Sequence, residues 1–390
     1  MSDELGENDG EIAATRASHS VPMLAQVDVG RENNLDLIRF VAATMVIYAH
    51  SFNLANRPDP IESVIGMPTG GFAVAVFFGM SGYLISRSLL NRDSIADFLL
   101  ARVLRIMPAL IVANLLAIIL GSIFWTELSQ REYWSDSGTW KFLAMNSSLI
   151  KNSYELPGVF LHNPFGPAVN GSLWTLPVEA RMYGIVFAAG VLSLLFSSGR
   201  SRIVLVTAFG FGSMVLSAGA WGALGIPEGS GLLGEAGIKL LGIFGCGMVL
   251  QGLRQWIPID GRVVLVMGLV YFLVRDTAVA DVAFMIWLPY TCLWLAYTPK
   301  FNAHDFARRG DFSYGIYIYA FPIQQWIYSL NAEIDPLWNA VTTFAVVLVL
   351  AWLSWNLVES PAIRMKKPAF RFKECIHSGI DRLTRKNHYE

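Results

Sequence analysis

Long apolar runs, separated by short polar joints, recur along the whole chain and limit its fold more than any other feature. Most are close to the ~20 residues that a helix needs to cross the hydrocarbon core of a bilayer. They predict about ten helices, at residues 35–54, 71–90, 105–125, 173–196, 203–222, 232–252, 263–275, 279–298, 313–330 and 336–358. Only 15% of the 390 residues are charged, against about 25% in a typical soluble domain. The sequence therefore predicts an all-α polytopic membrane protein, a bundle of about ten transmembrane helices with the lipid bilayer as its solvent.

Basic residues indicate how this bundle is oriented. Ten spans place both termini on one side, and the joints and tail of that side carry nineteen basic residues, against five on the other side. Cytoplasmic joints are enriched in Lys and Arg, so both termini are expected to be cytoplasmic. The formal net charge of −1 argues against a nucleic-acid partner, because no basic excess is available to neutralise phosphates.

Three parts are expected along the chain. Residues 1–34 are rich in acidic residues and lack an apolar stretch, which predicts a disordered cytoplasmic tail and not a signal peptide. Residues 35–358 form the transmembrane domain, and 359–390 form a basic cytoplasmic tail. The one long joint, 126–172, lies on the outer side and is rich in aromatic residues. It is either a functional loop or a segment lying at the membrane interface, where aromatic residues gather.

Charges inside a span are costly, by about 2.5–3.5 kcal/mol at its centre, so those that occur are informative. Arg39 and His50 lie eleven positions apart in the first span. They are about 16 Å apart along a helix axis and on roughly the same face. This pattern favours a fixed cation near the cytoplasm and a titratable imidazole in the outer half. The alternative is a snorkelling arginine with a structurally packed histidine.

Two arginines, Arg102 and Arg105, lie at i and i+3 near the expected start of the third span. They share one helix face, and two guanidiniums so placed can bind phosphate oxygens. The alternative is topological, because basic residues are expected at a cytoplasmic joint.

Glu179 and Arg181 lie inside the outer end of the fourth span. Residues at i and i+2 do not face each other on a helix, so the partner of Glu179 must come from another element. Glu179 is at a depth comparable with that of His50, and the two could form an acid–base pair. The alternative is a structural ion pair between Glu179 and a cation.

The last two spans also carry polar groups. Ser313, Tyr317 and other polar residues give 313–330 a polar side, and Glu359 lies at the end of 336–358, before Pro361. Pro361 is expected to end that helix. Glu359 could simply anchor a cytoplasmic arginine, and an aromatic stripe of this kind is more often core packing.

Six of these segments, in this order, resemble the acyltransferase 3 family of bacterial membrane-bound acyltransferases. The resemblance covers about residues 33–365 and is carried by LDLIRFVAATMVIYAH, GGFAVAVFFGMSGYLI, FLLARVLRIMPAL, GSLWTLPVEARMYG, FSYGIYIYAFPI and VESPAIR. It implies an O-acyltransferase of the bacterial inner membrane that takes acetyl-CoA as co-substrate and a cell-surface or exported carbohydrate as acceptor. It implies no bound cofactor and no metal, and it leaves the oligomeric state undefined.

The resemblance also assigns roles to individual residues. His50 is the implied catalytic residue, eleven positions after Arg39. Arg102 and Arg105 match the family's donor-binding arginine pair, and we expect Arg39 to bind the donor phosphates with them. Glu179 and Tyr183 match its Leu-Trp-x-Leu-x-Val-Glu segment, and we expect Glu179 to orient or charge-balance His50. Glu359 and Pro361 match the closing Glu-x-Pro.

One family position differs in this chain. Many members carry a histidine before the Phe-Pro of the ninth span, and this chain has Ala320 there. More of the chemistry is therefore expected to depend on His50. Ser172, Trp174 and the 126–172 loop are expected to receive the glycan, because aromatic rings suit sugar faces.

A transporter that moves a lipid or glycan without covalent chemistry is the alternative from another class. Intramembrane Arg, Glu and His are equally expected there. The sequence shows no inverted repeat, which argues mildly against it.

Overall fold

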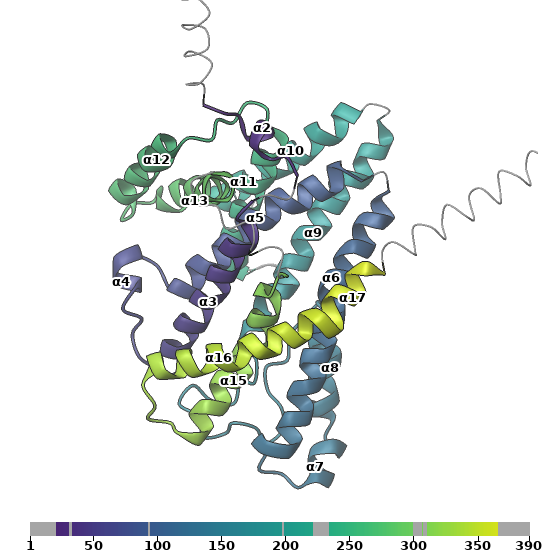
Figure 1. The fold of residues 1–390 in the computed structure, drawn as a ribbon, viewed down its shortest axis with the longest axis vertical. Helices are drawn as coiled ribbons and strands as arrows, with labels where there is room; N and C mark the ends of the chain where they lie inside the picture. Colours follow the sequence, from purple (N-terminus) through teal and green to yellow (C-terminus); the bar gives the residue numbers. More distant parts are fainter. Residues whose placement is uncertain are drawn as a thin grey trace, which may run out of the picture.

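The computed structural model describes residues 21–30, 33–92, 94–196, 199–220, 234–298, 306 and 310–365. Over these residues the regular structure is helical, with isolated β-bridges only (Figure 1). The main helices are α3 (Leu35–Leu54), α5 (Thr69–Leu90), α6 (Ile95–Leu120), α9 (Thr175–Leu192), α10 (Gly199–Val215), α11 (Gly234–Gly252), α12 (Gly261–Val274), α13 (Ala280–Tyr297), α15 (Ser313–Leu330) and α16 (Pro336–Ser354). The shorter ones are α2 (Leu24–Val27), α4 (Glu62–Ile65), η1 (Gly121–Trp125), α7 (Gln130–Ser135), α8 (Ser137–Ser148), η2 (Gly171–Trp174), η3 (Ser193–Leu195), η4 (Leu216–Ala220), η6 (Trp355–Glu359) and α17 (Ser360–Arg364).

Each expected span overlaps one of the main helices. Within the described residues, seven helical stretches are long and apolar enough to cross a membrane, and α12 is apolar but shorter. Helices α11 and α15 are long enough but are not among the seven, because glycines and polar residues lower their hydropathy. The structure thus confirms an all-helical, multi-pass membrane protein, while its count of qualifying spans is lower than ten.

Two helix boundaries differ from the sequence prediction. Helix α6 begins at Ile95, ten residues before the expected start at residue 105, because Phe98 and Ala101 are buried and extend its packed face. Arg102 and Arg105 therefore lie inside a continuous helix. Pro361 does not end the last helix, because it lies in the first turn of α17, which continues to Arg364; a proline is tolerated there.

Helix α5 lies at the centre of the bundle, between α3 and α11. Small residues permit this packing: a Cβ on Gly82 would meet the Phe244 carbonyl, and a Cβ on Gly247 would meet that of Gly79. Membrane helices commonly approach each other through such residues. The packing fixes α5 against α11, and both helices line the cavities described below.

Residues 21–30 pack on the bundle, which differs from the disordered tail expected for 1–34; residues 1–20 lie outside the described residues. The buried Asp28 carboxylate accepts hydrogen bonds from Tyr83 and Tyr297, both at 2.6 Å, and from Arg87 at 2.5 Å. Arg254 donates at 3.3 Å to the carboxylate oxygen that also accepts from Tyr83. Asp28 thus joins the ends of α5, α11 and α13. The expected tail 359–390 lies outside the described residues from 366 onward.

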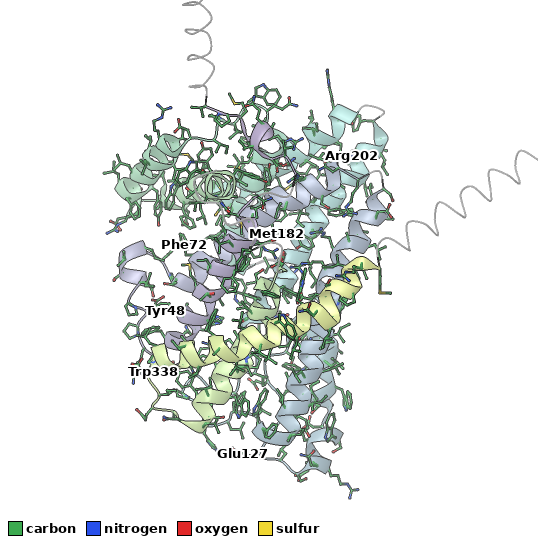
Figure 2. All side chains as sticks on the ribbon, viewed as in Figure 1. Tyr48, Phe72, Glu127, Met182, Arg202 and Trp338 are labelled. Atoms are coloured by element: carbon green, nitrogen blue, oxygen red, sulfur yellow. The ribbon has the colours of Figure 1, made fainter. Side chains whose placement is uncertain are left out.

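The long joint folds into a small unit with its own core. Helix α7 is the lowest labelled helix in Figure 1, and α8 lies beside the lower part of α6. Figure 2 places Glu127 of this joint and Arg202 of α10 toward opposite ends of the molecule. The core of the unit consists of Trp125, Tyr133, Phe142, Leu156, Val159, Phe160 and Val169, with Ala117 and Ile118 of α6. Asn163 donates to the Gln325 carbonyl at 2.8 Å, and Asn170 donates to that of Ile318 at 2.9 Å. The joint is therefore fixed against α15.

Candidate active site

An ion cluster lies at one end of the bundle, which we call the Arg39 end. Asp311, just before α15, accepts a 2.5 Å bond from Arg39 and a second bond from Arg105. Arg105 also lies 3.0 Å from Glu359, whose side chain is 1% exposed. Ser313 donates to Asp311 at 2.5 Å. Two guanidiniums and two carboxylates therefore balance each other.

Arg102 is placed differently from Arg105. Arg102 forms no ion pair within the described residues, and its Nε is buried without a hydrogen-bond partner. A buried unpaired donor costs about 1–3 kcal/mol. Its electrostatic neighbours are Tyr183 and Glu179, besides Arg92 and Arg105. Arg102 is thus available to an anion in a way that Arg105 is not.

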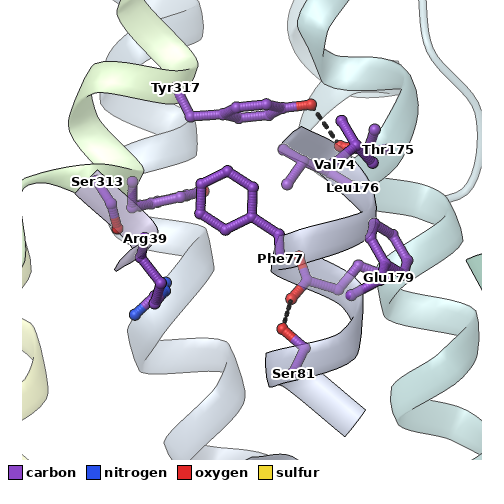
Figure 3. Close-up of a pocket in the computed structure, with 11 residues that line it drawn as sticks. Arg39, Val74, Phe77, Ser81, Thr175, Leu176, Glu179, Ser313 and Tyr317 are labelled. Atoms are coloured by element: carbon purple, nitrogen blue, oxygen red, sulfur yellow. Dashed lines mark hydrogen bonds between the residues drawn. The ribbon is translucent and has the colours of Figure 1, made fainter. Parts of the chain in front are cut away.

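Glu179 lines a central cavity of about 50 Å³ together with Arg39, Ser81, Ser313 and other residues (Figure 3). Ser81 donates to Glu179 at 3.3 Å, and Tyr183 donates to the same oxygen. Phe77 lies across the middle of this cavity in Figure 3, between Glu179 and the Tyr317 ring. Glu179 therefore belongs to the part of the bundle that also holds Arg39.

His50 lies toward the other end of α3, which we call the His50 end. Its Nδ1 is 3.5 Å from the Ser172 hydroxyl, and its ring meets Phe321 edge-on at 5.1 Å. Tyr317 donates to the Ser172 carbonyl at 2.6 Å and shares a 2.6 Å hydrogen bond with Thr175. The structure thus gathers His50, Ser172 and Tyr317 from three elements.

A buried polar network fixes the turn of α3 next to His50. Gln324 of α15 donates to Ser51 at 2.6 Å and to the Ile47 carbonyl at 2.8 Å. Ser51 donates to Asn339 of α16 at 3.1 Å, and Asn339 donates back to the Gln324 carbonyl at 3.2 Å. These side chains are fully buried, so the network holds α3, α15 and α16 in one arrangement and positions the imidazole.

A second cavity, the His50 cavity, has a volume of about 280 Å³ and is lined by His50, Asn53, Trp174, Tyr317 and other residues. It shares Val74 and Tyr317 with the central cavity. Those two side chains therefore separate the Glu179 side from the His50 side. A half-buried imidazole on a cavity of this size can accept a proton from a hydroxyl group placed there.

The expected contact between Glu179 and His50 is absent from the described hydrogen bonds and ion pairs. Glu179 bonds to Ser81 and Tyr183 instead, and it lines the central cavity while His50 lines the other one. The two residues therefore face different spaces.

The other expected residues fall into two groups. Ser172, Trp174 and Tyr317 surround His50, whereas Ser313 and Glu359 belong to the ion cluster. The rest of the long joint does not match the expectation, because no residue of 126–170 lines the His50 cavity. Within the described residues, no group of three or more His, Cys, Asp or Glu side chains could hold a metal ion.

Sequence reasoning missed Asp311 and Thr175. Asp311 precedes the first turn of α15 by two residues, so it falls outside the apolar pattern of that span. The signal that could have found it is charge balance, because the arginines buried at that end require carboxylate partners.

This arrangement is that of a multi-pass membrane enzyme in which the His50 cavity is separate from the arginines of the Arg39 end. The sequence profile of the acyltransferase domain family matches residues 32–356, and the chain belongs to this acyltransferase 3 family of membrane acyltransferases. It is therefore an acyltransferase, which favours covalent chemistry over the transporter alternative.

Two relatives are similar over nearly their whole length. A protein of Shigella phage Sf6 named O-acetyl transferase is 30% identical over 349 residues, which cover 87% of this chain and 98% of the relative. Nodulation protein 10 of Rhizobium leguminosarum bv. viciae is 25% identical over 363 residues, covering 86% and 95%. No solved structure matches the chain significantly.

Proposed function

We propose that this protein moves an acetyl group from cytoplasmic acetyl-CoA to a hydroxyl of a cell-surface or exported carbohydrate, across the bacterial inner membrane. The observation that carries the proposal is the pair of cavities that meet at Val74 and Tyr317, one next to buried arginines and one lined by His50. An O-acetyl transferase among the relatives supports the choice of acyl group and of oxygen as acceptor.

On the donor side, Arg102 is the residue that binds a CoA phosphate. Arg39 and Arg105 are already paired with Asp311 and Glu359. Their role is therefore to stabilise the ion cluster at the Arg39 end and to add to the electrostatic attraction of the anionic donor. The excess of basic residues on joints of this side supports a cytoplasmic donor. Glu179 acts on the same side, where it is an electrostatic neighbour of Arg102.

On the acceptor side, His50 is the general base. With Nδ1–H directed to Ser172, Nε2 keeps its lone pair and removes the proton of the sugar hydroxyl. The oxygen attacks the thioester carbon, the C–S bond breaks, and the CoA thiolate takes up a proton from the imidazolium. The 3.5 Å His50–Ser172 separation is long, but catalytic hydrogen bonds often tighten only when substrate binds. Tyr317 and Trp174 border the reacting groups.

The direct test measures label from radiolabelled acetyl-CoA in the glycan of membranes that contain wild type or His50→Ala. We expect wild type to transfer label, and His50→Ala to fall by about 10²–10⁴-fold, the range for a general base. His162→Ala is the matched control, because His162 is 84% exposed and lies in the long joint. Normal transfer by His50→Ala at equal expression would refute this mechanism.

A further inference from the structure

The His50 cavity borders a larger space, the side chamber, of about 470 Å³. The two share the following lining residues: Glu62, Pro68, Gly71, Val74 and Trp174. The two spaces therefore adjoin, and the side chamber extends from Trp174 toward α11, α12 and α13. Each is close to or within the roughly 300–1,000 Å³ of typical ligand pockets, so together they exceed what one reacting group requires.

The opposite side of His50 is closed. Phe321 covers the imidazole edge, and Phe165 of the long joint packs on Phe321 at 6.2 Å. Gln325 holds that segment in place by donating to the carbonyls of Gly166 at 3.0 Å and Ala168 at 2.8 Å. These contacts leave no route along the 126–172 joint on this side of His50, and the side chamber is the larger space on the other side.

The walls of the chamber combine aromatic and charged side chains. Tyr271 and Phe284 contact each other at 5.4 Å and line it with Trp174. Lys239 and Asp281 form a 3.2 Å ion pair, and Glu62 and Arg275 lie beside them. Aromatic walls with a few convergent polar groups are typical of specific ligand sites. The charges of these two acidic and two basic side chains cancel, so the chamber does not require a charged ligand.

We propose that the side chamber is the acceptor subsite, which holds the neighbouring sugars of an uncharged glycan while one sugar reaches His50. The protein would then act on an oligosaccharide or polysaccharide in preference to a single sugar. This inference rests on the proposed function and gives it a substrate class. Lys239, Asp281, Glu62 and Arg275 are the residues that determine which glycan fits.

The test uses the full-length protein in membranes and its own acceptor as the probe. Glycan from the expressing cells is stripped of O-acetyl groups, partly hydrolysed with acid and sorted by length. Wild-type kcat/KM is expected to rise by about tenfold or more from single sugars to fragments of several sugars. Ala236→Trp adds bulk to the chamber wall from α11, and Ala236 is exposed, so the variant should fold normally.

We expect Ala236→Trp to remove the gain for longer fragments and to leave transfer to single sugars within about twofold of wild type. Ala280→Trp tests the opposite wall, on α13. Ala278→Trp is the matched control, because Ala278 is exposed two residues away and does not line the chamber.

The possible failures are distinct. Wild-type transfer without dependence on fragment length, or equal losses for Ala236→Trp and Ala278→Trp, would refute the chamber assignment alone. A uniform loss with single sugars and long fragments would also refute it, because the block would then act at His50. Absence of transfer by wild type to fragments of any length would refute the proposed function together with the subsite.

Discussion

Arg102 and Arg105 are three residues apart on α6, yet their contacts predict opposite effects of substitution. Arg105 bonds to Asp311 and lies 3.0 Å from Glu359. Arg102 has a buried Nε without a partner and forms no ion pair within the described part of the chain. We therefore expect Arg105→Ala to reduce stability and Arg102→Ala to reduce donor affinity.

The magnitudes follow from burial. Arg105→Ala leaves the Glu359 carboxylate, 1% exposed, without its cation. Removing one partner of a buried ion pair costs about 3–5 kcal/mol, and the 17% exposure of the Arg105 side chain favours the lower end. Arg102→Ala removes an unpaired donor, so its effect on the free energy of unfolding should stay within about 1 kcal/mol. Loss of one charge-assisted bond to phosphate, about 1.5–3 kcal/mol, raises the KM for acetyl-CoA by about 10–100-fold.

Two measurements on each purified variant separate these effects: thermal unfolding in detergent and the KM for acetyl-CoA. The double variant Arg105→Met with Glu359→Gln is the control, because replacing both partners should recover much of the lost stability. Equal destabilisation by Arg102→Ala and Arg105→Ala would refute the distinction. An unchanged KM for Arg102→Ala would refute its role in donor binding.

Three further predictions follow from other contacts. Tyr317→Phe removes the hydroxyl that bonds to Thr175; we expect kcat to fall about tenfold with an unchanged KM for acetyl-CoA, and an unchanged kcat would contradict this. Asp28→Asn removes the charge that pairs two arginines and should lower the free energy of unfolding by about 3 kcal/mol, measured as a lower melting temperature. A membrane-impermeant maleimide applied to intact cells should label Glu127→Cys, while Gln255→Cys should react only after permeabilisation; the reverse result would invert the proposed orientation.

Much of the fold could be predicted because lipid imposes a simple length rule on apolar segments. The bounds of α3 and α15 agree with the predicted spans at both ends. The start of α6 does not, because Ile95–Leu104 is held as helix by buried side chains such as Phe98 and not by continuous hydrophobicity. The packing of residues 21–30 depends on Asp28, whose partners are distant in sequence and give no local signal.

For the candidate site, the sequence could predict only the position of each residue along its helix axis. Counting residues along a helix gives depth, and it placed Glu179 at a level similar to that of His50. Counting does not give the rotation of each helix or its neighbours, and these direct Glu179 toward Arg39 and His50 toward the other cavity. Tyr317 was predicted from the polar side of its span and Ser172 from its place beside Trp174 at the end of the long joint, whereas Asp311 required the assembled bundle.

Val74 and Tyr317 form a partition between the central cavity and the His50 cavity. In the proposed reaction, this partition explains how one enzyme could bind substrates from opposite sides of a membrane. The central cavity is small, about 50 Å³, well below the roughly 300–1,000 Å³ of typical ligand pockets. The wider spaces lie beyond Tyr317 and Val74, on the side of His50. In the proposed reaction the thioester is thus the only part of the donor that must reach the partition. The glycan never has to enter the bundle beyond the depth of His50, so acyl transfer requires no passage of the glycan through the membrane.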